Sequence, residues 1–251
     1  MRSKLVAGNW KMHGSRAAIS ELLSELIKAL PSEPKLDMAV FPPAVFAAQT
    51  VEALRGSALA VGLQNICDQG GEGAFTGEVS AEMAVDIGCR YVMIGHSERR
   101  ALYGESNEQV ADKLARAIEA RLLPIVCVGE SESERDEGRT LEVVSAQLAP
   151  LLARFSLEEL SSLVVAYEPV WAIGTGKTAS PAQAQEVHAF IRGVFAERDA
   201  DFAQRLRILY GGSVKAANAA ELFSQTDIDG GLVGGASLNA QEFSAICRAA
   251  E

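Results

Sequence analysis

One glutamate stands where an apolar run of the sequence ends. Glu168 follows directly on residues 163–167. A carboxylate in that position is desolvated and well placed to accept a proton from a substrate. The next segment, residues 169–179, is glycine-rich and apolar in its middle, a composition typical of a lid. We therefore expect Glu168 to be a catalytic base beneath a lid with an exposed tip at 171–173; an ordinary loop is the alternative.

Two other apolar runs are followed by groups that could stabilise negative charge. Asn9 and Lys11 follow residues 5–7, and on an extended chain their side chains point the same way. A lysine beside an amide can hold an anion, although a lysine taken alone is more often simply solvated. His96 follows residues 91–94, and the helix start expected just after it favours a neutral imidazole. Its place at a strand end favours a functional role over a structural one.

Glycine pairs accompany the last two apolar runs. Gly211 and Gly212 precede Ser213, and Gly234 and Gly235 follow the final run. Glycines let backbone N–H groups converge on an oxyanion, and barrel enzymes often bind phosphate at these two loops. Ordinary turns are the alternative, since turns also favour glycine.

The elements that must position these residues form a repeat. Short, near-continuous apolar runs are typical of parallel strands covered on both faces, and helical spacing fills the segments between them. The runs are residues 5–7, 38–41, 58–61, 91–94, 125–128, 163–167, 208–210 and 232–233. Eight units in 251 residues leave roughly 31 residues each, the size of a strand–helix unit. The first run lacks a GxGxxG sequence, which favours a closed (β/α)8 barrel over a doubly wound sheet.

The barrel prediction gives the candidate residues a common location. Active sites of such barrels lie at the carboxyl ends of the strands, where all of these groups stand. No linker divides the chain, so we expect residues 1–251 to form one α/β domain. Helices are predicted over residues 107–120 and 182–195, and another should begin after an N-cap at Ser15. We interpret residues 130–139, which are dense in charge, as a solvated loop leading into a helix.

Composition limits the possible partners. The formal net charge of −10 argues against nucleic acid and anionic membranes, which both need a basic face. Four widely spaced cysteines form no CxxC pair, so free thiols in a reducing compartment are expected. No signal segment or membrane-length apolar stretch is apparent, and these features predict a soluble cytoplasmic protein.

Five motifs, in register from end to end of the chain, resemble the triosephosphate isomerase family. They are Gly8-Asn9-Trp10-Lys11, Ile94-Gly95-His96-Ser97-Glu98-Arg99, the lid segment 167–176, Tyr210-Gly211-Gly212-Ser213 and Gly234-Gly235-Ala236-Ser237-Leu238. The resemblance implies interconversion of dihydroxyacetone phosphate and D-glyceraldehyde 3-phosphate through an enediolate. The lid motif is very specific to this family.

The resemblance also implies a role for each candidate. Glu168 would move the proton, neutral His96 would polarise the carbonyl oxygens, and Lys11, helped by Asn9, would offset negative charge. The phosphate would be held by the N–H groups of Gly174, Ser213, Gly234 and Gly235. The resemblance implies neither a metal nor an organic cofactor, because the lysine and histidine supply the electrophile.

A glycine-rich segment, residues 64–78, resembles the loop through which family members dimerise. The resemblance implies a homodimer in which Thr76 lies near Asn9 and Lys11 of the other subunit; a flexible surface loop is the alternative. Two other functions compete with the isomerase. Another phosphate-binding barrel enzyme would lack the Asn-x-Lys, His and Glu set beside this lid. A catalytically idle binding barrel would have lost Glu168, His96 or Lys11.

Overall fold

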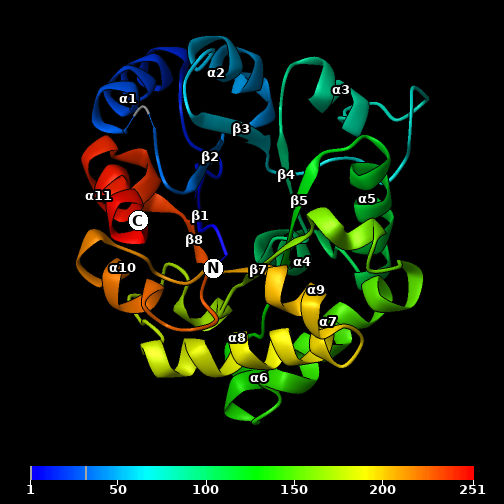
Figure 1. The fold of residues 1–251 in the computed structure, drawn as a ribbon. Helices are drawn as coiled ribbons and strands as arrows, with labels where there is room; N and C mark the ends of the chain where they lie inside the picture. The colour runs from blue at the N-terminus through cyan, green and yellow to red at the C-terminus, as the bar shows by residue number, and fades with distance from the viewer. Residues whose placement is uncertain (1, 32) are drawn as a thin grey trace.

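A closed barrel of parallel strands forms the centre of the computed structural model, which describes residues 2–31 and 33–251 (Figure 1). The strands are β1 (Leu5–Asn9), β2 (Asp37–Phe41), β3 (Leu59–Leu63), β4 (Tyr91–Ile94), β5 (Leu123–Val128), β6 (Val164–Tyr167), β7 (Arg207–Tyr210) and β8 (Gly230–Val233). Each strand pairs in parallel with its neighbours in sequence, and β8 returns to β1 with Val6 opposite Gly231. The predicted (β/α)8 barrel is confirmed.

Helices surround the barrel on its outside (Figure 1). They are α1 (Arg16–Ala29), α2 (Ala47–Ala53), α3 (Ala81–Asp86), α4 (Ser97–Tyr103), α5 (Asn107–Glu119), α6 (Glu132–Asp136), α7 (Thr140–Arg154), α8 (Pro181–Ala196), α9 (Ala200–Arg205), α10 (Ala216–Phe223) and α11 (Ala240–Ala250). Within residues 2–31 and 33–251, no helix is both long and apolar enough to span a bilayer.

Local sequence explains where the helices begin. Ser15 caps α1 by accepting the N–H of Ala18 at 3.2 Å, as predicted. Ser180 caps α8 in a reciprocal capping box with Gln183, and Pro181 occupies the first turn, where its missing N–H costs no hydrogen bond. These caps fix the phase of each helix, so that its apolar stripe faces the sheet.

Alternation along the strands divides the core into two layers. In β1, Leu5 and Ala7 point into the barrel, whereas Val6 points outward against the helices. The inner layer is completed by side chains of the other strands: Ala39, Phe41, Tyr91, Met93, Ile125, Cys127, Val164, Ala166, Leu209 and Leu232. The barrel is therefore filled, and any site must lie at one of its ends.

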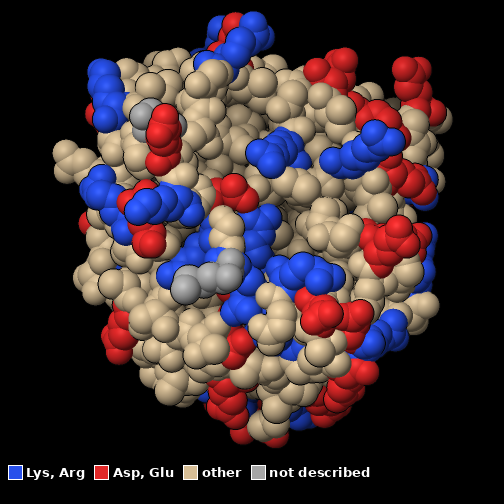
Figure 2. All heavy atoms as spheres, viewed as in Figure 1, with Lys and Arg blue, Asp and Glu red and all other residues tan. Residues whose placement is uncertain are grey.

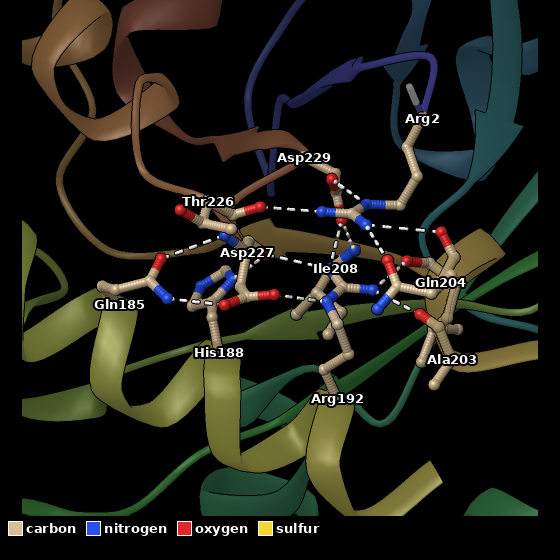
Figure 3. Close-up of polar contacts among 11 residues, drawn as sticks. Arg2, Gln185, His188, Arg192, Ala203, Gln204, Ile208, Thr226, Asp227 and Asp229 are labelled. Atoms are coloured by element: carbon tan, nitrogen blue, oxygen red, sulfur yellow. Dashed lines mark hydrogen bonds and ion pairs between the residues drawn. The ribbon is translucent and has the colours of Figure 1, made fainter. Parts of the chain in front are cut away.

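Ion pairs connect separate segments of the chain at the end of the barrel where the strands begin. Figure 3 shows Arg192 of α8 reaching the segment before β8, where it bonds Asp227 at 2.5 Å and Asp229 at 2.8 Å. Asp229 also accepts the Arg2 Nε–H at 2.6 Å and the Ile208 N–H at 2.9 Å. This buried carboxylate thus joins Arg2 to β7 and α8 where the barrel closes.

Basic side chains collect on this face although the protein is acidic. Figure 2 shows Lys and Arg side chains gathered in its middle. At this end of the barrel, Arg2, Arg205 and Arg207 line a hollow. Arg207 pairs with Asp37 at 2.6 Å, from β7 to β2. These contacts close the base of the barrel, at the end opposite the candidate site.

Candidate active site

The carboxyl ends of the strands surround a hollow of about 270 Å³. All eight residues that the sequence singled out line it: Asn9, Lys11, His96, Glu168, Gly174, Ser213, Gly234 and Gly235. Side chains and loops from β1, β4, β6, β7 and β8 meet here because parallel strands of a barrel end at the same mouth.

The Glu168 carboxylate is buried and held by three donors. It is 2 % exposed; Oε2 accepts the Ser97 N–H at 2.9 Å, and Oε1 lies 3.2 Å from Ser97 Oγ and 2.9 Å from His96 Nε2. Burial alone would raise the pKa of the carboxyl, but His96 and the Ser97 hydrogen bonds outweigh it and lower the pKa below its ordinary value. Glu168 is therefore an ionised carboxylate at neutral pH, able to accept a proton.

Neighbouring glycines let the chain approach Glu168 closely. A Cβ on Gly129 would lie 1.8 Å from the Glu168 carbonyl oxygen, and one on Gly211 would lie 2.8 Å from its Cγ. Both substitutions would displace the carboxylate. The glycines after β5 and β7 therefore belong to the packing that fixes Glu168.

The His96 ring is oriented by the start of α4. His96 is the N-cap of that helix, and its Nδ1 accepts the Glu98 N–H at 3.1 Å. Burial lowers the pKa of His96, but the charge and hydrogen bond of Glu168 together raise it above its ordinary value. A second proton on Nδ1 would face the Glu98 N–H, so we assign the neutral ring that donates from Nε2.

Lys11 adopts a conformation that the sequence did not predict. β1 ends at Asn9, and Lys11 has a left-handed φ of 48°, so the extended geometry expected for this pair is wrong. Asn9 Oδ1 accepts the Lys11 N–H at 2.9 Å, and Gln64 donates to the Lys11 carbonyl at 2.8 Å. The ammonium group bonds Glu98 at 2.6 Å. These contacts brace a strained backbone that brings Lys11 into the hollow.

The lid segment is only partly as expected. Residues Val170–Ala172 form a 3-10 turn in which Ala172 is fully buried, so the expected exposed tip at 171–173 is wrong. The exposed stretch is residues 174–178. Thr175 Oγ donates to the Trp171 carbonyl at 2.7 Å, and Lys177 pairs with Glu132 of α6. The apolar side chains anchor the lid, and the glycine-rich part faces solvent.

Glu130 is buried and accepts several hydrogen bonds. The prediction that it lies in a solvated loop is therefore wrong. Its carboxylate is 0 % exposed and accepts the Trp171 Nε1–H at 2.9 Å and the Tyr167 hydroxyl at 3.1 Å. Arg135 lies 3.3 Å from it. Glu130 stands just beyond β5, so its position at a strand end was the signal that could have identified it. Ser97, which also went unrecognised, carried no comparable signal.

The fold and the polar groups gathered at one mouth of the barrel place the chain among the (β/α)8-barrel proteins with a site at the carboxyl ends of their strands. A family model described as "Triosephosphate isomerase" matches residues 4–250, and the chain belongs to this family.

Relatives of similar length carry the same name. A curated protein from Thiobacillus denitrificans named "Triosephosphate isomerase" is 61 % identical over 250 residues, covering 100 % of this chain and 99 % of the relative. Relatives with that name from Pseudomonas putida strain W619 and Pseudomonas aeruginosa strain LESB58 are 54 % and 55 % identical, with the same coverage of both chains. The similarity therefore extends over the whole barrel.

Proposed function

We propose that this protein interconverts dihydroxyacetone phosphate and D-glyceraldehyde 3-phosphate by proton transfer through an enediolate. The observation that carries this proposal is the pairing of the buried Glu168 carboxylate with His96 Nε2 at 2.9 Å, in one hollow with Lys11. The full-length relatives named triosephosphate isomerase support the same substrates.

Glu168 acts as the base. Its carboxylate takes the proton from the carbon beside the carbonyl group and returns it to the neighbouring carbon. Ser97 binds this carboxylate, so it must leave the Ser97 N–H and hydroxyl to reach the substrate. Its lowered pKa keeps it ionised at neutral pH.

His96 and Lys11 stabilise the charge that this transfer creates. The Nε2–H of the neutral His96 ring donates to the substrate oxygens and exchanges protons between them in the enediolate. The Lys11 ammonium offsets the negative charge, with Asn9 beside it. Because these side chains supply the electrophile, the proposed reaction uses neither a metal nor an organic cofactor.

The phosphate occupies the loops after β7 and β8. We assign its binding to the backbone N–H groups of Gly174, Ser213, Gly234 and Gly235, which line the hollow. Closure of the lid over residues 169–179 brings Gly174 to the phosphate and excludes water, which protects the enediolate from losing phosphate. A Cβ on Gly235 would meet nothing within 4 Å, so there is room for a ligand at this loop.

We also propose that the protein is a homodimer formed through residues 64–78. This loop projects beside α3 and α5 in Figure 1. Met12, Val45 and Tyr103 are exposed by 94 %, 83 % and 71 %, large apolar side chains that a partner would cover. A second hollow of about 370 Å³ adjoins Lys11, and we assign it to a loop of the partner.

We also propose a single domain, a cytoplasmic location, and no nucleic-acid or membrane partner. Pairing of β8 with β1 joins the two ends of the chain and supports one domain over residues 1–251. The four unpaired, buried cysteines support a cytoplasmic location. The net charge of −10 supports the expectation that neither nucleic acid nor an anionic membrane is a partner.

A coupled assay with D-glyceraldehyde 3-phosphate tests the proposed function. The wild-type protein should form dihydroxyacetone phosphate, and Glu168→Gln should lower kcat about 10²- to 10⁴-fold because the amide cannot accept the proton. Glu186→Gln, an exposed position on α8, is the matched control and should keep wild-type turnover. An inactive wild-type protein, or an active Glu168→Gln variant, would refute the proposal.

A further inference from the structure

The inner layer of the barrel contains a sulfur atom directly beneath the site. Met93 lies on β4, three residues before His96, and its side chain is 1 % exposed. It belongs to the inner apolar layer and also lines the hollow beside Lys11. Met93 Sδ lies 3.7 Å from Asn9 Nδ2, a distance at which an amide N–H donates to a thioether.

The hydrogen bonds of Asn9 determine which way its amide faces. The Lys11 backbone N–H is a donor and lies 2.9 Å from one end of the amide, so that end must be the oxygen. The NH₂ group therefore faces Met93, with Sδ as its acceptor. If the amide were flipped, its NH₂ group would face the Lys11 N–H, donor against donor. Its oxygen would then face the Met93 sulfur, which is not a donor.

The surroundings offer the Asn9 amide little other support. Asn9 is 5 % exposed and ends β1, two residues after Ala7 of the apolar inner layer. Sulfur is the polarisable acceptor in this apolar layer. A hydrocarbon of the same volume would fill the space but leave a buried N–H without its acceptor.

We propose that Met93 is a positioning residue for the isomerisation. Its thioether fixes the Asn9 amide, whose oxygen in turn braces the left-handed backbone of Lys11 and whose remaining N–H faces the hollow. Met93 acts through Asn9 and does not touch the substrate. The inference rests on the proposed function, because it assigns Met93 to the reaction in which Asn9 and Lys11 take part.

A double-mutant cycle separates this role from simple packing. Met93→Leu conserves volume and removes the acceptor, and it should lower kcat/KM about threefold to tenfold. In an Asn9→Ala background, the same substitution should change kcat/KM less than about twofold, because the amide that Met93 holds is gone. Met38→Leu, at a buried methionine of the outer layer on β2, is the matched control and should match wild type.

The side-chain amide signals of Asn9 provide a second readout. In ¹⁵N-labelled protein, Met93→Leu should shift the Asn9 NH₂ signals and speed their exchange with water, whereas Met38→Leu should leave both unchanged. Wild-type kcat/KM in Met93→Leu, or an equal loss in both Asn9 backgrounds, would overturn the inference. Failure of the proposed function is a different result, namely an inactive wild-type protein.

Discussion

Glu168 and the two residues that hold it belong to different parts of the chain. Its three donor groups all come from His96 and Ser97, more than 70 residues earlier in sequence. The sequence identified Glu168 and His96 by their positions after strands. It could not identify Ser97 as the group that holds the carboxylate, because that contact depends on how β4 and β6 are arranged around the barrel.

The position of the Glu168 carboxylate can be tested by shortening its side chain. Glu168→Asp should lower kcat about 100-fold, because the carboxylate withdraws by about 1 Å, while KM should change less than about threefold. Steady-state kinetics with both triose phosphates measure the two constants separately. An aspartate variant with wild-type turnover would show that Glu168 is not the base.

The contribution proposed for the Lys11 charge can be tested separately. Lys11→Ala should lower kcat/KM at least about 10²- to 10³-fold, because both the substrate phosphate and the developing enediolate lose a cation. Lys28→Ala removes an exposed lysine of α1 and should have no effect on kinetics. Unchanged kinetics in a folded Lys11→Ala protein, checked by circular dichroism, would contradict the role assigned to the ammonium group.

At the scale of elements, α8 shows what periodicity can and cannot predict. Residues 182–195 were predicted as a helix, and the structure has Pro181–Ala196. Its buried face, however, includes His188 and Arg192, which bond the segment at Asp227 and Asp229 (Figure 3). Polar residues on a helix are predicted to face solvent, because their distant buried partners are not visible in a local pattern.

The buried ring of His188 makes folding stability depend on pH. Its Nδ1 lies 3.2 Å from the Asp227 carbonyl, and burial, as the largest cause, lowers the pKa from 6.5 to about 3. Below pH 6.5 the unfolded chain therefore binds a proton that the folded protein does not. Stability should fall by about 1.4 kcal/mol per pH unit on acidification from about pH 6.5 toward pH 5.

Urea unfolding of wild type and His188→Asn between about pH 7.5 and 5 measures this dependence. The asparagine amide can still donate to the Asp227 carbonyl but does not titrate, so the slope specific to His188 should disappear. Carboxylate titrations are common to both proteins and cancel in the difference. Parallel curves for the two proteins would show that His188 is not the source.

The lid shows how far a loop can be predicted from its sequence. The sequence predicted a lid segment from its glycines and apolar residues, but it placed the exposed tip three residues too early. Trp171 is held by Glu130, which lies 41 residues earlier in the chain. Composition predicts that a segment can move; only the packing of its apolar residues determines which part is anchored.

For the molecule as a whole, the sequence predicted the barrel because apolar runs recur in step with the strand–helix repeat. The run 91–94 coincides with β4, but β3 and β8 extend beyond their predicted runs at Gly62 and Gly230. The predicted runs were defined by apolar residues and therefore left these glycines out. In the barrel, a Cβ on Gly62 would lie 2.4 Å from the Phe41 ring and one on Gly230 would lie 1.9 Å from the Leu5 carbonyl oxygen.

The proposed dimer can be tested at the tip of the loop 64–78. Sedimentation should show a wild-type dimer at micromolar protein, and Thr76→Glu should shift it toward the monomer because a charge would be buried at the interface. Its kcat/KM should fall with the loss of the partner's loop near Lys11. Ala153→Glu, an exposed position on α7, should remain dimeric and active. A stable wild-type monomer would refute the dimer.

Isomerisation in deuterium oxide tests the central claim, proton transfer by Glu168, most directly. Dihydroxyacetone phosphate formed there from D-glyceraldehyde 3-phosphate should carry deuterium at carbon 1 in part of the product by ¹H NMR, because the proton on the Glu168 carboxyl exchanges with solvent. Glu168→Gln should form almost no product. Deuterium-free product from the wild-type protein together with wild-type turnover in Glu168→Gln would contradict proton transfer by this carboxylate.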